Sequence, residues 1–175
     1  MGSGADATIH QIYFTGGLDM NTPGDYLFID LYQDYGAFTG SDIGSGTFTI
    51  SGDDAAYSTC GVCVTIAAQA DTTMVDDWYM ATGGIVTLTS VSGRLTGSVQ
   101  NLSFRRVATD ANGGPGDTPL DGPSGACNSH ITSASFDVAL MLGSAAAGAP
   151  SAPRRHAAAR APSSPSVAAL QSRRG

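Results

Sequence analysis

The sequence predicts an all-β fold, specifically an antiparallel β-sandwich of about eight short strands. The first observation is compositional, because the 175-residue chain has no lysine and no glutamate, and its fifteen acidic residues are all aspartate. Lys and Glu favour helices, whereas Asp favours turns. The second is that short apolar or alternating segments are separated by turn residues, and the third is that no long amphipathic helix is visible. A partly open β-barrel is the nearest alternative.

Two strands are expected in the N-terminal part of the chain, over residues 8–14 and 26–32. In the second of these, Leu27, Ile29 and Leu31 share one face. Its short length and its aromatic and β-branched content favour a strand over a helix.

The next segment, residues 46–51, alternates between apolar and hydroxyl side chains. Phe48 and Ile50 are expected to point into a core, and Thr47 and Thr49 toward solvent. A turn is expected to follow.

Residues 57–68 contain two cysteines at the entry of a buried strand. The residues of one parity that should face the core are Val62, Val64 and Ile66. If the strand already begins at Cys60, this thiol points to the same side and Cys63 to the other, because successive side chains of a strand alternate.

Two further strands, 77–82 and 85–91, are expected to form a hairpin at Gly83-Gly84, a dipeptide that suits a tight turn. The following strand, 94–107, changes parity near residues 100–101 and so predicts a β-bulge there.

Residues 109–126 are rich in Gly, Pro and Asp and predict a long loop. The last expected strand covers 131–142. Its core-facing residues are expected to be Ala134, Phe136, Val138, Leu140 and Leu142.

Composition divides the chain into a β-sandwich domain, residues 1–142, and an Ala/Pro/Ser/Arg-rich segment, residues 143–175, which is expected to be disordered. The first part has fifteen Asp against three Arg, a formal charge of −12, and the second has five Arg and no acid, a charge of +5. An acidic domain repels nucleic acid, so nucleic-acid binding is not expected. No apolar window reaches the roughly 18 residues of a transmembrane helix.

The three cysteines cannot all pair within one chain. In an exported protein, one disulfide and one spare thiol are expected, whereas a cytosolic location favours metal or redox chemistry. The first six residues lack a basic region followed by an apolar run, so no signal peptide is visible.

Several short motifs follow one another in a fixed order between residues 25 and 142. They are Leu31-Tyr32 followed by Phe38, Gly46-Thr-Phe-Thr-Ile50, Tyr57-Ser-Thr-Cys-Gly-Val-Cys-Val64, Thr82-Gly-Gly84, Gly93-Arg-Leu-Thr-Gly97, Asn101-Leu-Ser-Phe-Arg-Arg-Val107, and Cys127 before Ser133-Ala-Ser-Phe-Asp137. In this order the chain resembles the Cys-x-x-Cys β modules of uncharacterised predicted lipoproteins and secreted proteins of myxobacteria. The resemblance implies an exported, cell-surface β domain of unknown function and assigns no catalytic residue. The chain departs from that group in its missing signal peptide or lipobox and its Arg-rich tail.

The cysteines allow two interpretations. Cys60 and Cys63, with Cys127 and His130, are a candidate set of structural zinc ligands, because three thiolates and one imidazole suit tetrahedral zinc. The alternative is a disulfide, either within the Cys-x-x-Cys motif or to Cys127, and it is favoured because zinc clips usually occupy tight knuckles and not a sandwich of this size. A redox role is disfavoured, because β-branched residues follow the motif where a helix would have to start.

A second candidate metal site lies in the long loop. Asp110, Asn112, Asp117 and Asp121 offer the oxygen ligands that calcium prefers. Pro115 occupies the position where an EF-hand needs Gly, so the alternative interpretation is a set of solvated turn residues.

No catalytic site emerges from the sequence. None of the three histidines is accompanied by a Gly-x-Ser-x-Gly elbow. Four aromatic residues could form a sugar-binding platform, although packing in the core is the commoner role of such side chains. These four are Tyr32, Tyr35, Trp78 and Tyr79.

The sequence therefore predicts an exported, cell-surface or extracellular β-sandwich module with a non-enzymatic structural or adhesive role. The alternative is a calcium- or carbohydrate-binding domain. No other cofactor is expected. The sequence does not identify a partner; a surface polymer and a protein are the two candidates.

Overall fold

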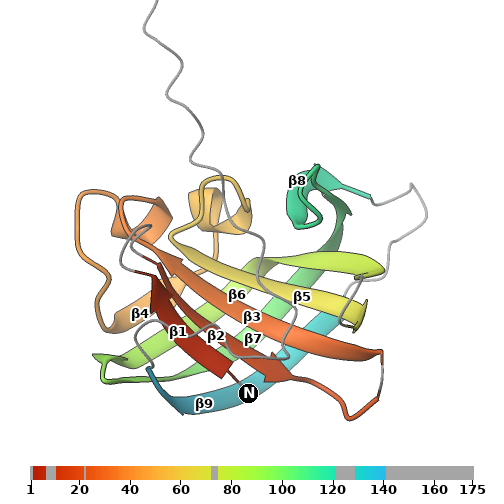
Figure 1. The fold of residues 1–175 in the computed structure, drawn as a ribbon. Coiled ribbons are helices and arrows are strands. Elements are labelled where there is room, and N and C mark those ends of the chain that lie inside the picture. Colours follow the sequence, from red (N-terminus) through yellow and green to blue (C-terminus); the bar gives the residue numbers. More distant parts are fainter. Residues whose placement is uncertain (1, 7–10, 22, 72–74, 121–128, 141–175) are drawn as a thin grey trace, which may run out of the picture.

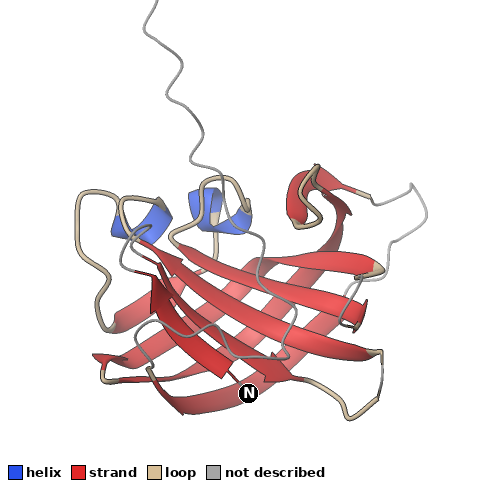
Figure 2. Ribbon diagram, viewed as in Figure 1, coloured by secondary structure: helices blue, strands red, loops and turns tan. Residues whose placement is uncertain are grey.

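The computed structural model describes residues 2–6, 11–21, 23–71, 75–120 and 129–140, with only the backbone described over 2–6 and at residues 11 and 13. These residues form nine antiparallel strands and two short 3₁₀ helices (Figure 1, Figure 2). The elements are β1 (Gly2–Asp6), β2 (Gln11–Gly17), β3 (Gly24–Tyr32), η1 (Gly36–Phe38), β4 (Gly46–Thr49), η2 (Gly52–Ala55), β5 (Val62–Ala70), β6 (Asp77–Ser92), β7 (Arg94–Thr109), β8 (Pro115–Pro119) and β9 (Ser129–Ala139).

The predicted sandwich is confirmed, and its two layers share two long strands. The first layer has the order β1-β2-β3-β5, continued by the N-terminal half of β6, the C-terminal half of β7, and β8. The second layer contains β4, the C-terminal half of β6, the N-terminal half of β7, and β9. In Figure 1 the red to yellow strands of the first layer cross in front of the second layer. Such crossing layers are typically joined by strands that bend from one sheet into the other.

The predicted hairpin at Gly83-Gly84 is wrong, because β6 runs continuously through these residues. The pairing of β6 with β7 shifts register on both sides of Gly83. Gly84 has a φ of 114°, and a Cβ there would lie 2.7 Å from the Cα of Leu102. The two glycines therefore bend the strand between layers instead of reversing it.

The predicted bulge in the facing strand is confirmed. Asn101 has a φ of 51° and no Cα partner in either neighbouring strand. It lies opposite the glycine bend of β6, so both long strands change layer at the same level.

The main core lies between the two layers. Its buried residues include Leu27, Ile29, Leu31, Ile50, Val62, Val64, Ile66, Val86, Leu88, Val99 and Phe136, and Phe48 and Val138 pack against them. The expectations for these residues are confirmed. Ala134 is exposed, contrary to prediction, and Leu142 lies outside the described residues.

The ends of the sheet approach each other without pairing. The rings of Phe14 on β2 and Phe136 on β9 lie 5.1 Å apart. β1 also approaches β9, but no ladder joins the two strands within the described part of the chain, so the sheet is not closed into a barrel.

Several boundaries differ from those predicted; for example, β2 extends to Gly17 and β9 ends at Ala139. β1 was not expected, because its sequence Gly-Ser-Gly-Ala-Asp has little β propensity; its backbone pairs with β2. β5 begins at Val62 instead of residue 57, and β8 lies within the predicted long loop. Residues 143–175, predicted to be disordered, lie outside the described residues. Neither short helix in the described ranges is long and apolar enough to cross a membrane.

Candidate functional site

A second apolar cluster covers the outer face of the first layer. Its buried members are Phe28, Tyr32, Tyr57, Cys60, Cys63, Ala67, Ala70, Trp78, Met80 and Val107. They come from β3, β5, the first half of β6, the end of β7, and the turn that precedes β5. We call this set the outer cluster.

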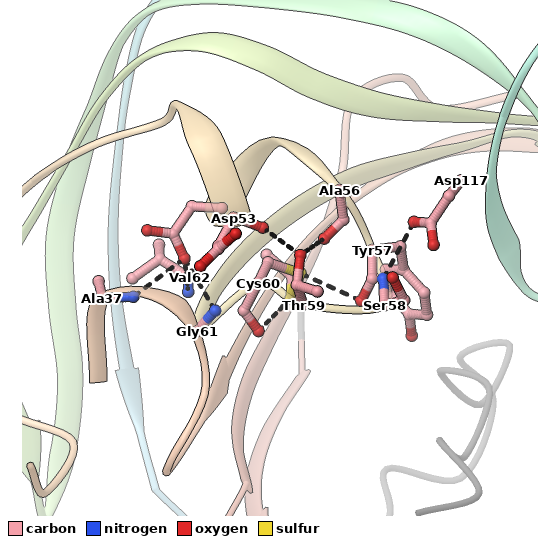
Figure 3. The surroundings of a disulfide bond; sticks show 12 residues. Ala37, Asp53, Ala56, Tyr57, Ser58, Thr59, Cys60, Gly61, Val62 and Asp117 are labelled. Carbon is pink, nitrogen blue, oxygen red and sulfur yellow. Dashed lines mark hydrogen bonds between the residues drawn. A yellow bond between two sulfur atoms is a disulfide. The ribbon is translucent and has the colours of Figure 1, made fainter. Parts of the chain in front are cut away.

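Cys60 and Cys63 form a disulfide within the outer cluster (Figure 3). Their Cα atoms are 5.2 Å apart, within the usual range for a disulfide, and both residues are 0% exposed. Cys60 lies in a turn, where its N–H donates to the carbonyl of Ala56 at 3.0 Å. The strand begins only at Val62, so the alternation expected from Cys60 does not apply, and both sulfur atoms reach the same side.

The carboxylate of Asp54 on η2 fixes this turn to the rest of the fold. Its Oδ1 accepts hydrogen bonds from the backbone N–H groups of Gly61 at 2.8 Å, Val62 at 3.0 Å and Ala37 at 3.3 Å. Asp54 is only 7% exposed. Figure 3 shows these nitrogen atoms converging. One buried side chain thus joins η1, η2 and the start of β5.

Gly61 is required by the close approach of two backbone segments. A Cβ at this position would overlap the carbonyl oxygen of Tyr35. The carbonyl of Gly61 in turn accepts the N–H of Tyr32 at 2.8 Å. The segment around the disulfide therefore packs on the end of β3 with no room for a side chain.

Two of the calcium candidates, Asp110 and Asp117, accept backbone N–H groups of different turns. Asp110 Oδ1 accepts the N–H groups of Asn112 at 2.8 Å and Gly114 at 2.9 Å within its own turn. Asp117 Oδ1 instead accepts the N–H of Ser58 at 3.0 Å and so connects β8 to the disulfide turn (Figure 3). Asp121 lies outside the described residues.

The structure describes three of the four zinc candidates. Cys60 and Cys63 are bonded to each other, His130 is exposed on β9, and Cys127 lies outside the described residues. Across the described ranges, no group of three or more His, Cys or Asp side chains is placed to hold a metal ion.

The four aromatic residues do not form an exposed platform. Trp78 and Tyr32 are each 3% exposed and belong to the outer cluster. The indole Nε1 of Trp78 donates to the carbonyl of Gly113 at 3.0 Å, so it holds the turn before β8. Tyr79 packs against the main core, and only Tyr35 is exposed.

The outer face of the second layer is polar, unlike the outer cluster. The sequence analysis predicted its solvent-facing residues only for β4. Thr47 and Thr49 point to solvent, as predicted. The neighbouring strands continue the same pattern, and together they form what we call the hydroxyl face. Its residues are Thr47, Thr49, Thr87, Thr89, Thr96, Ser98, Ser133 and Ser135. The signal was present in the sequence, because hydroxyl residues are spaced by two in each of four segments.

No protein-family model, no curated protein and no solved structure matches this chain. The resemblance to myxobacterial secreted modules therefore stays a prediction.

Proposed function

We propose that this chain is an exported β-sandwich module with a structural or adhesive role at the cell surface or outside the cell. The observation that carries the proposal is the fully buried disulfide between Cys60 and Cys63. Disulfides form and persist in oxidising compartments, whereas cytosolic thiols are kept reduced. Because neither sulfur is accessible, the bond is suited to stabilising the fold and not to exchanging electrons with other thiols.

The use of the acidic side chains supports a non-enzymatic role. The carboxylates of Asp54, Asp110 and Asp117 accept backbone N–H groups of turns. Those of Asp77 and Asp137 pair with arginines. These groups, which an enzyme could use for acid–base chemistry, are engaged in holding loops and strands together.

The proposal is tested by counting thiols and locating the protein in the cells that produce it. The purified protein is unfolded in denaturant without reductant, alkylated, and weighed by intact-mass spectrometry. One alkylated thiol per chain is expected, because three cysteines minus one disulfide leave one. Denaturant is needed because the buried sulfur atoms would escape the reagent in the folded protein.

Location is measured by treating intact cells with a protease. Cleavage of the module without cell lysis is the expected result. Three alkylated thiols, or protection of the module until the cells are lysed, would contradict the proposal.

A further inference from the structure

The hydroxyl face has a regular geometry. One row crosses four strands, because Thr47 on β4 pairs with Thr87 on β6, Thr87 with Ser98 on β7, and Ser98 with Ser135 on β9. Neighbouring strands are about 4.8 Å apart, and residues spaced by two along a strand are separated by about 6.6 Å. The result is one complete row of hydroxyl groups, flanked by two partial rows that also contain Ile85, Gln100 and Asp137.

Neighbouring hydroxyls fix each other's orientation. The Oγ1 atoms of Thr47 and Thr87 are 3.4 Å apart, and those of Thr89 and Thr96 are 2.7 Å apart. β-Branched side chains also have few allowed rotamers. The threonines of this face are therefore restricted before any partner binds, which lowers the entropy cost of binding through them.

This face differs in charge from the rest of the domain. The charged side chains that the described strands place on it are Arg94 and Asp137, and they neutralise each other in an ion pair at one end of the face. The domain as a whole is strongly acidic. An anionic polymer approaching this face would meet the repulsive field of the domain, whereas an uncharged one would not.

Hydroxyl groups both donate and accept hydrogen bonds, so they suit a partner that presents both functions repeatedly. A sugar polymer does so along its whole length. Each neutral hydrogen bond contributes only about 0.5–1.5 kcal/mol net of water, so several contacts must form together, which favours a polymer over a single sugar. Strand twist of about 20–25° per strand pair rotates successive rows, and a flexible chain can follow this rotation while a rigid crystal face cannot.

We propose that the hydroxyl face binds an uncharged polysaccharide whose chain lies across the four strands along the row Thr47, Thr87, Ser98 and Ser135. The exposed side chain of Ile85, between β4 and β7, adds an apolar contact for a sugar ring. This inference rests on the proposed function, because a surface module would meet such polymers outside the cell.

The test is affinity electrophoresis of the full chain in native gels that contain hydroxyethyl cellulose, dextran or the anionic polymer alginate. Retardation by at least one neutral polymer, and none by alginate, is expected. The variant Thr47→Val/Thr87→Val removes two hydroxyls while keeping side-chain shape, and should weaken the apparent affinity about tenfold. Ser98→Ala/Ser135→Ala should act in the same direction.

Thr118→Val is the matched control, because Thr118 is an exposed threonine on β8, away from this face. It should be retarded like the wild type, and thermal unfolding should show that all variants fold. Absence of retardation in both neutral gels, equal retardation by alginate, or unchanged binding by both double variants would overturn the inference. The thiol count and cell-surface location are measured separately, so failure here is distinguishable from failure of the proposed function.

Discussion

The two outer faces of this sandwich are built in opposite ways. On the first layer, Phe28, Thr65 and Met80 lie side by side on three strands and are each only 1% exposed. On the second layer, Thr47 and Ser135 are open to solvent. The outer face of the first layer is therefore apolar and packed, whereas the outer face of the second layer is polar and open to solvent.

The difference follows from the side-chain pattern of each strand. β3 has apolar residues on both parities, with Leu27 and Ile29 toward the main core and Phe28 toward the outer cluster. β4 alternates apolar and hydroxyl residues. A strand that is apolar on both faces must be packed against other residues on both, whereas an alternating strand must be packed on one face only. The turn with the disulfide contributes to the packing on the outer face of the first layer.

The largest expected effect comes from truncating the packed face. Phe28→Ala should destabilise the fold by about 3–5 kcal/mol, because it leaves a cavity in the outer cluster. Ile85→Ala, the matched truncation on the open face, should cost less than about 1 kcal/mol. Urea unfolding followed by circular dichroism measures both. Similar losses in the two variants would mean that the two faces do not differ in packing.

Removal of the Asp54 carboxylate, which anchors the disulfide turn, should have the next largest effect on stability. Asp54→Ala leaves the buried N–H groups of Gly61 and Val62 without an acceptor and should cost about 2–4 kcal/mol. Asp54→Asn keeps one acceptor oxygen and should cost less. The same denaturant titration measures both variants, and an Ala variant as stable as the Asn variant would argue against this role.

Loss of the disulfide should have a smaller effect. The bond closes a loop of sequence separation 3, so the chain-entropy estimate for Cys60→Ala/Cys63→Ala is a loss of about 2 kcal/mol. Because the disulfide is buried, reductant should affect the wild type only in denaturant. Equal midpoints with and without reductant in denaturant would show that the bond contributes nothing to stability.

The smallest expected effect is a pH dependence at the β2–β3 turn. The N–H of Asp25 and the amide of Asn21 bond to the carboxylate of Asp19 and lower its pKa below the ordinary value of 3.8. Its contribution to stability is therefore complete above pH 3.8 and is lost as the pH falls through the lower folded pKa. In thermal melts at different pH values, the melting temperature of Asp19→Asn should therefore fall slightly less at acidic pH than that of the wild type.

The sequence was sufficient for the layers and for most of the main core, because Phe48, Ile50 and Val64 follow the period of a strand. It was not sufficient at Gly83-Gly84, because a glycine pair is equally compatible with a tight turn and with a bend between layers. The choice depended on the facing bulge at Asn101, which is a contact distant in sequence.

The disulfide turn was also beyond local reasoning. The position where β5 begins is set by Asp54, which binds the N–H groups of Gly61 and Val62 from η2. Counting alternate side chains from Cys60 therefore placed the two cysteine side chains on opposite sides of the strand, whereas they are bonded to each other. The hydroxyl face, by contrast, is encoded by four short sequence patterns. Only the order of the strands, which the structure shows, was needed to place these patterns next to one another.

The central claim is that the outer face of the first layer is packed, in contrast to the open hydroxyl face, and methionine oxidation tests this packing most directly, with Met20 as an exposed reference. Met80 lies in the packed outer cluster, whereas Met20 is fully exposed in the β2–β3 turn. Exposed methionines are oxidised to the sulfoxide far more readily than buried ones. With dilute hydrogen peroxide and peptide mass spectrometry, Met20 should be oxidised while Met80 stays reduced. Oxidation of Met80 at the same rate as Met20 in the folded protein would contradict the account.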